Sequence, residues 1–361
     1  MNKIILFSMF LILLSNFSFG KDLKNATQMK GVYVTAWNTG YFTEVQVDNT
    51  ISACRKLGAT DLFIQVRKFD DAYYSSNFVP QNSSIENFDP LLYTIKKAKE
   101  QGIKVHAWFV ICRLSNGNYK STLPINMQSW LNKDVNDNVV SSDNVYIDPT
   151  NTEARNYICK VIKEVVDNYD VDGVHLDYIR YPDKNFGFTD NAKLSFKKET
   201  GSSNFSSTAF ADFRRKQLDN MVKEINLTVR NSKNGENIII SAATIVWGGV
   251  TPYIKSSSYD RVYQDWKKWL SNDWIDIAIP MLYKRESVSE QSKDFRKWVS
   301  EFRNISDFNR IAPAVSYEMN NAAQCAAQVR ALEREGYGWG IFSFNEIKNR
   351  DALASALKTK I

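Results

Sequence analysis

The spacing of apolar residues switches repeatedly between two patterns along the chain. Short runs rich in β-branched and aromatic residues, typical of buried strands, are separated by longer segments with apolar residues at helical spacing. Residues 31–37 (GVYVTAW) are of the first kind, whereas in residues 45–57 the side chains of Val47, Ile51 and Leu57 fall on one helical face. The pattern predicts a protein of the α/β class.

Eight strands of this kind, each followed by a helix, are expected. The strands cover residues 31–37, 61–66, 104–110, 171–177, 237–243, 274–280, 310–315 and 338–344, and the helices cover 45–57, 89–101, 153–169, 208–230, 263–270, 294–302, 322–335 and 351–358. Two Ser- and Asn-rich segments, 111–145 and 183–207, predict long loops. The alternation predicts a single (β/α)8 TIM barrel with long loops at its C-terminal face. The competing doubly wound sheet would need a glycine-rich phosphate loop, and the sequence has no G-x-G-x-x-G or P-loop motif.

The beginning of the chain predicts export. Lys3 precedes an apolar run at 4–14, and small residues follow at 18–20, so we expect residues 1–20 to be a signal peptide and 21–361 the barrel. The apolar run is too short for a comfortable membrane span, and no second stretch approaches the ~20 residues that one needs. A secreted, cell-wall-associated protein is therefore expected, with no membrane span after signal removal. The mild net charge of +6 fits residence near an anionic wall.

Composition narrows the chemistry further. The basic residues are scattered and form no nucleic-acid motif, so no nucleic acid partner is expected. Four cysteines, at positions 54, 112, 159 and 325, form no C-x-x-C pair, and we expect mostly buried free thiols and no metal site. With His106 and His175 as the only histidines, a mechanism that needs several imidazoles is excluded. No cofactor is expected, and the oligomeric state is left open.

The segment 171–182 (VDGVHLDYIRYP) carries the strongest chemical signal. It reads as a buried strand that ends in charged and aromatic residues. Because successive side chains of a strand point to opposite faces, His175 and Asp177 face one way and Val174 and Leu176 the other. The apolar pair can pack under helices, which places Asp177 inside the barrel at the strand's C-terminal end, where barrels hold their active sites.

The last residues of the other strands extend this signal to a whole rim. Aromatic faces suit stacking on sugar rings, and Asp, Arg and His suit hydrogen bonds to hydroxyl groups, so the set indicates a carbohydrate cleft. Without metal-ligand spacing or a nucleophilic serine motif, hydrolysis by paired carboxylates is the chemistry best supplied with residues. Besides Asp177, the expected substrate-binding or catalytic residues are Arg67, Asp71, His106, Trp108, His175, Tyr178, Arg180, Trp247, Tyr283, Tyr317, Glu318 and Glu346, and Trp37 and Asp70 lie at the same strand ends.

Several segments together resemble the bacterial family-10-like glycoside hydrolases, an extracellular (β/α)8 group. They are QVRKFDDAYY (65–74), GIKVHAWF (102–109), the Asp-Pro pair at 148–149, NYDVDGVHLDYIRYP (168–182), FRR (213–215) and WIDIAIPMLY (274–283). The similarity covers residues 29–344, which is most of the expected mature chain. It implies cleavage of bacterial cell-wall glycan, including peptidoglycan strands stripped of their peptides, and hence a polysaccharide or oligosaccharide substrate.

Two departures from related patterns matter for the mechanism. Many members of the resembled family carry a second acid where this chain has Tyr178 after Asp177, so a second carboxylate must come from elsewhere. The motif also looks like the D-G-x-D-x-D-x-E of family-18 chitinases, but His175 and Ile179 replace that family's aspartate and acid glutamate. A chitinase-type assisted mechanism would therefore lack its proton donor.

Two hypotheses of function follow. The first is a secreted glycoside hydrolase acting on an N-acetylated cell-wall glycan, with Asp177 as one catalytic carboxylate and Glu318 as its partner, because fourth- and seventh-strand ends face each other across many glycosidase barrels. Glu346 and Asp71 are the reserve candidates. The second is a glycan-binding barrel without turnover, since losing one acid disables hydrolysis and leaves the aromatic cleft.

The roles of the two carboxylates depend on the neighbours of Asp177. We expect Arg67 or His175 to lie within hydrogen-bonding distance of Asp177 and to keep it ionised, which leaves the acid role to Glu318 or another rim carboxylate. If Arg67 instead pairs with Asp71 and Asp177 touches only apolar groups, the roles reverse and Asp177 becomes the proton donor.

Overall fold

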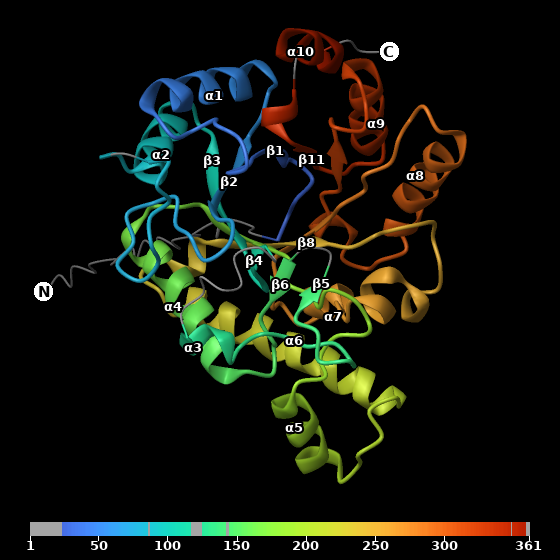
Figure 1. Cartoon of the computed structure of the whole chain (residues 1–361). Coiled ribbons are helices and arrows are strands. Elements are labelled where there is room, and N and C mark those ends of the chain that lie inside the picture. The colour runs from blue at the N-terminus through green and yellow to red at the C-terminus, as the bar shows by residue number, and fades with distance from the viewer. Residues whose placement is uncertain (1–23, 86, 117–124, 142–143, 348, 359–361) are drawn as a thin grey trace, which may run out of the picture.

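A parallel sheet of eight strands forms the centre of the computed structural model, which describes residues 24–85, 87–116, 125–141, 144–347 and 349–358 (Figure 1). The strand order is β10-β11-β1-β2-β3-β7-β8-β9. In chain order the strands are β1 (Lys30–Val34), β2 (Asp61–Arg67), β3 (Lys104–Val110), β7 (Gly173–Asp177), β8 (Ile239–Thr244), β9 (Ile277–Pro280), β10 (Ala314–Ser316) and β11 (Trp339–Phe342).

The two ends of this sheet meet and close it into a barrel. Parallel bridges join Ala278 to Ile311 and Met281 to Ala314, and the amide of Leu282 donates to the carbonyl of Ala314 across 2.9 Å. Closure leaves the sheet without an open edge. The predicted (β/α)8 barrel is thus confirmed.

Helices surround the barrel and begin at local capping signals. Asp89 caps α2 by accepting from the amide of Leu92, and Pro90 follows at the first helical position, as the sequence predicts. Asn321 and Gln324 form a reciprocal capping box at α9. The main helices are α1 (Glu44–Lys56), α2 (Pro90–Glu100), α4 (Thr152–Asn168), α6 (Thr208–Arg230), α7 (Trp266–Ser271), α8 (Ser289–Phe302), α9 (Ala322–Arg334) and α10 (Arg350–Lys358), with short turns at Gly235–Asn237, Tyr253–Lys255, Ser257–Arg261, Phe308–Arg310 and Phe344–Glu346.

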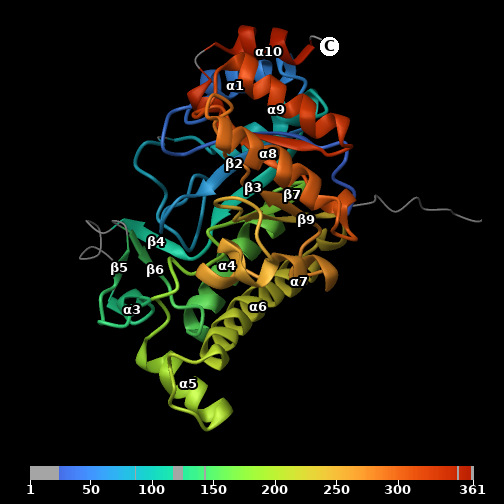
Figure 2. The same cartoon turned by 90° about the vertical axis from the view of Figure 1, so that its right-hand side faces the viewer.

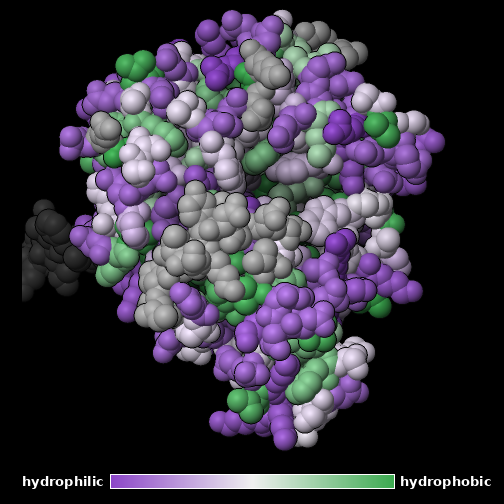
Figure 3. Space-filling view, in the orientation of Figure 1, coloured by the Kyte–Doolittle hydropathy of each residue, from purple (hydrophilic) through white to green (hydrophobic). Residues whose placement is uncertain are grey.

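The two segments expected to be long loops contain secondary structure of their own. The first holds a small antiparallel sheet of β4 (Arg113–Asn116), β6 (Asn144–Tyr146) and β5 (Val140–Ser141), together with the single turn α3 (Ile125–Gln128). The second holds α5 (Asp190–Thr200), which projects beyond the end of α6 in both views (Figures 1 and 2). The space-filling view shows hydrophobic residues among hydrophilic ones on this projection (Figure 3).

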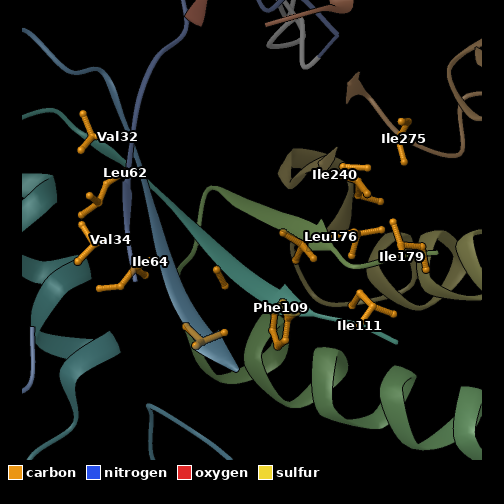
Figure 4. Close-up of a cluster of buried hydrophobic side chains, with 14 of the residues drawn as sticks. Val32, Val34, Leu62, Ile64, Phe109, Ile111, Leu176, Ile179, Ile240 and Ile275 are labelled. Carbon is orange, nitrogen blue, oxygen red and sulfur yellow. The ribbon is translucent and has the colours of Figure 1, made fainter. Parts of the chain in front are cut away.

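The core has an outer and an inner layer, set by the alternation of side chains along the strands. Val32, Leu62 and Leu176 belong to the large cluster between strands and helices (Figure 4). Tyr33 and Phe63 face the other way and fill the barrel interior. The polar residues of β7 share this inner side.

Two expectations concern the ends and the thiols of the chain. The predicted signal peptide, residues 1–20, lies outside the described residues, and none of the described helices has the length and apolar character needed to cross a membrane. Cys54 of α1 and Cys325 of α9 are buried, as is Cys112, whereas Cys159 of α4 is partly exposed.

Candidate active site

Asp177 ends β7 inside the mouth of the barrel, as the alternation along this strand predicts. Only 7% of the residue is exposed. One carboxylate oxygen, Oδ2, accepts a hydrogen bond from Nε1 of Trp108 at 3.1 Å, and Oδ1 accepts from the amide of Tyr178 at 2.7 Å. Tyr178 has a positive φ of 51°, an uncommon conformation for a tyrosine, and the chain leaves the strand at this residue. Such strain is often found at functional sites.

The surroundings of Asp177 raise the pKa of its carboxyl group. Burial raises the pKa of this carboxyl, and the charges of Arg180 and Arg113 and the two hydrogen bonds only partly oppose that effect. A buried carboxyl that holds its proton more tightly than usual suits the role of an acid catalyst.

The predicted contact of Arg67 or His175 with Asp177 is wrong. Arg67 donates from Nη1 to the carbonyl of Val110, and its Nη2 lies 4.0 Å from Oδ1 of Asp70. The reason is a β-bulge: Gln65 pairs with Trp108, but Arg67 pairs with Phe109, so the face of Arg67 is switched relative to the regular alternation. The hydrogen bonds to Asp177 come from the Trp108 indole and the Tyr178 amide, so no hydrogen-bonded cation keeps it ionised among the described residues.

The two histidines lie below the rim. His175 is fully buried, with Nδ1 2.9 Å from Oγ of Ser241 and Nε2 3.3 Å from the hydroxyl of Tyr33. Burial, helped by the charge of His106, lowers the pKa of His175 well below its usual value, so the imidazole is neutral. His106 is also fully buried and pairs through Nε2 with Asp61 at 2.9 Å. Both residues support the floor of the site.

Tyr283 lies in the neighbourhood of both Asp177 and the predicted second carboxylate, Glu318. Burial raises the pKa of its phenol, and the charges of Asp177, Tyr178 and Glu318 raise it further. The side chain of Tyr283 therefore lies within electrostatic range of both Asp177 and Glu318. Glu318 is exposed, two residues beyond the end of β10. Tyr317, which lies between the end of β10 and Glu318, is partly buried. Its amide donates to the carbonyl of Phe342 at 2.7 Å.

A row of alternating aromatic and arginine side chains crosses the rim beside Asp177. The guanidinium of Arg113 lies 5.2 Å from the ring centre of Trp37 and 4.2 Å from that of Tyr178. Arg180 lies 4.5 Å from the Tyr178 ring and 5.4 Å from the Trp247 ring. Trp37 and Trp247 are 42% and 40% exposed, so each can offer a ring face to a ligand.

The remaining reserve carboxylates differ in their surroundings. Asp71 accepts hydrogen bonds from the amides of Lys68 and Phe69 and from the side chains of Tyr73 and Asn82, which fix the loop after β2. The backbone of Glu346 lies in the turn after β11, but its side chain is outside the described part of the structure. Within that part, no group of three or more His, Cys, Asp or Glu residues is arranged to hold a metal ion.

Arg113 and Tyr33 also belong to the site, although they are not among the residues predicted from the sequence. Arg113 follows the apolar run of β3 by three residues, and this placement of a charge directly behind a buried strand is a signal for the site. Tyr33 lies inside the barrel, where it touches His175, and burial, with the charges of Tyr283 and Asp177, raises its pKa well above the ordinary value.

The sequence of residues 28–310 matches the family described as glycosyl hydrolase-like 10. The chain belongs to this family. Among curated relatives, the glycosyl hydrolase YngK of Bacillus subtilis is 27% identical over 285 residues, which is 74% of this chain and 54% of that protein. The glycosyl hydrolase DigH of Escherichia coli K12 is 28% identical over 274 residues, 68% of this chain and 59% of that protein. The chain thus spans little more than half the length of these relatives.

Solved structures support the fold. The glycoside hydrolase domain of PgaB (BpsB) from Bordetella bronchiseptica superposes with a TM-score of 0.72 at 13% identity, covering 92% of this chain and 99% of that one. The catalytic domain of a β-amylase from Paenibacillus polymyxa gives a TM-score of 0.62 at 11% identity, covering 90% of this chain and 94% of that one. At these identities the likeness concerns the barrel alone.

Proposed function

We propose that this protein is a secreted glycoside hydrolase that cleaves the O-glycosidic bonds of an N-acetylated bacterial cell-wall glycan, namely peptidoglycan strands. The observation that carries the proposal is Asp177, a buried carboxyl of raised pKa at the C-terminal end of a barrel strand, beside a row of exposed aromatic rings. Membership of a glycosyl hydrolase-like family supports hydrolysis. Export and the cell-wall substrate rest on the sequence and on the family resemblance.

Asp177 is the proton donor in this mechanism. It gives its proton to the glycosidic oxygen as the bond from that oxygen to the anomeric carbon breaks, so the leaving sugar departs with a hydroxyl group. The indole of Trp108 and the amide of Tyr178 then stabilise the carboxylate that remains, because both already donate to its oxygens. This role reverses the assignment expected from the sequence.

Glu318 is the second carboxylate. It lies beyond β10, and its charge and that of Asp177 act on the same phenol, Tyr283. It either attacks the anomeric carbon or takes a proton from the attacking water, and the separation of the two carboxylates decides between these routes. Asp71 is a poorer candidate because its oxygens already hold the loop after β2.

The test uses purified peptidoglycan strands stripped of their peptides. Incubation with the wild-type protein is expected to release shorter saccharides with new reducing ends, detected by mass spectrometry. Strands that stay intact over a wide pH range while the protein binds them would support the second candidate, a glycan-binding barrel without turnover. What favours that candidate is Tyr178. It follows Asp177 at the position where the family resemblance leads us to expect a second acid, so that acid is missing here.

A further inference from the structure

Two buried arginines flank one tyrosine at the edge of the candidate active site. Arg113 comes from β4 and Arg180 from the segment after β7, and they are 7% and 9% exposed. Their guanidinium groups lie 4.2 and 4.5 Å from the ring centre of Tyr178. Both charges also act on Asp177, which places the pair next to the acid catalyst.

Part of the hydrogen-bonding capacity of these arginines is unused. Nη1 of Arg113 donates to the hydroxyl of Tyr178 at 3.2 Å, but its buried Nε and Nη2 have no hydrogen-bond partner, and neither has the buried Nε of Arg180. Neither arginine forms an ion pair among the residues that the structure describes. Buried arginines elsewhere do, for instance Arg155 with Glu224 at 2.8 Å and Arg310 with Asp273 at 3.0 Å.

Leaving two guanidinium groups buried and unpaired around one tyrosine ring is unfavourable, since each has lost water and gained no counter-ion in return. An anion that reaches the free N–H groups of both arginines would satisfy them and neutralise the charge. We propose that Arg113 and Arg180 form a subsite for a carboxylate group carried by the glycan, next to the bond that is cleaved. This subsite rests on the proposed function and adds a requirement for a carboxylated sugar.

The geometry of the free donors favours a carboxylate. In Arg113 the free Nε and Nη2 lie on the same edge of the guanidinium group and present two parallel N–H bonds, which match the two oxygens of a carboxylate. Trp37 and Trp247 lie next to the two arginines in the row and can stack on the sugar rings that bring the carboxylate into place. Suitable groups are the lactyl ether of a muramic acid residue freed of its peptide, or the carboxyl group of a uronic acid.

A bound carboxylate would also act on the catalyst. The positive charges of Arg113 and Arg180 lower the pKa of Asp177 against the larger effect of burial. Neutralising these charges by the substrate removes the opposing effect, so Asp177 holds its proton more firmly once the proper glycan is bound. An uncharged glycan would leave the arginines as they are.

The test compares two substrates that differ only in this group: peptide-free peptidoglycan strands and the same strands after methyl esterification of their carboxyl groups. The wild-type protein should prefer the free acid by about 10- to 100-fold in kcat/KM, as expected for a charged hydrogen-bonded pair. Arg113→Met and Arg180→Met should lose this preference for the free acid. Arg113→Lys should restore only part of it, because lysine lacks the two parallel donors. Arg261→Met, which removes an exposed arginine that stacks on Trp247 and pairs with Asp183, is the control and should keep the preference.

A second readout separates binding from support of the fold. With the wild-type protein, the alkaline limb of the kcat profile should lie at higher pH on free-acid strands than on esterified strands. Equal cleavage of both substrates by the wild-type protein and both Met variants would overturn the subsite and leave the hydrolase intact. If the wild-type protein cleaves neither substrate, the proposed function fails, and the binding affinities for the two kinds of strand test the subsite. Tighter binding of the free-acid strands that is lost in Arg113→Met supports the subsite. Equal binding of both strands overturns it.

Discussion

The indole nitrogen of Trp108 on β3 donates a 3.1 Å hydrogen bond to Oδ2 of Asp177 on the adjacent strand β7. Both side chains point into the barrel. Trp108 pairs with His175, and His175 and Asp177 lie on the same face of β7 because they are two residues apart. The bond stabilises the ionised carboxylate, whereas the burial of Asp177 favours the protonated form, and burial has the larger effect. In the proposed mechanism, the Trp108 indole therefore also stabilises the negative charge of Asp177 after the proton has left.

Replacing Trp108 with phenylalanine keeps a ring at this position and removes the donor. The hydrogen bond lowers the pKa of Asp177, so its loss raises that pKa. Because the acid must be protonated to act, the alkaline limb of the kcat/KM profile should move to higher pH, by about one unit. Trp37→Phe, which changes a neighbouring ring without a hydrogen bond to Asp177, should leave the limb in place. A shift of the Trp108→Phe limb to lower pH would contradict the assignment.

His175 predicts how the stability of the fold depends on pH. Its pKa is well below 6.5 in the folded protein because it is buried, so the unfolded chain takes up a proton there first. The contribution of neutral His175 is complete above about pH 6.5 and is lost as the pH falls below it, at about 1.4 kcal/mol per pH unit. The measurement is denaturant unfolding of the wild type and of His175→Gln between pH 4 and 8, a range set by the ordinary histidine pKa of about 6.5. Below that pKa, the free energy of unfolding should fall more steeply with decreasing pH in the wild type than in His175→Gln. Parallel curves would show that His175 does not titrate in this way.

Gly173 lets His106 pack against the floor of the site. A Cβ atom at this glycine would lie 2.1 Å from Nδ1 of His106, so the imidazole would have to move away from Asp61. Gly173→Ala should lower the free energy of unfolding by about 2–4 kcal/mol. The control is Gly201→Ala, where φ is +72° but no atom lies within 4 Å of the added Cβ, and about 1 kcal/mol is expected. Equal losses in chemical denaturation would contradict the close packing.

Trp247 tests the aromatic row as a sugar-binding surface. It is 40% exposed, so its removal should leave stability nearly unchanged. Trp247→Ala, made in an Asp177→Asn background that prevents turnover, should weaken binding of peptide-free strands by about 3- to 10-fold. Trp247→Phe should retain part of the affinity. Phe78→Ala, at another exposed aromatic residue, serves as the control. If it weakens binding of the strands as much as Trp247→Ala does, the aromatic row has no special role in sugar binding.

The sequence predicts the barrel well and the smaller elements poorly, for physical reasons. Barrel strands are buried on both faces and read as apolar runs, whereas α5 buries only Ala192 and Phe196 and has little apolar periodicity. The small sheet of β4, β5 and β6 pairs polar residues such as Asn116 and Asn144, so its strands read as loop.

The same contrast holds for the site. The position of Asp177 follows from alternation along one strand, which needs no knowledge of other elements. The position of Arg67 depends on a bulge opposite Trp108 and Phe109, a pairing irregularity that no local pattern announces. Arg113 joins the site through the loop sheet, an element that the sequence does not predict.

The participation of Asp177 in catalysis is tested most directly by Asp177→Asn. Its kcat/KM on peptide-free peptidoglycan strands should fall by about 10²- to 10⁴-fold at unchanged folding, as expected for the loss of an acid catalyst. The matched control is Asp170→Asn, the same substitution on an exposed residue just before β7, at the opposite end of this strand, and it should retain wild-type activity. Asp177→Asn cleaving the strands at the wild-type rate would remove Asp177 from the mechanism.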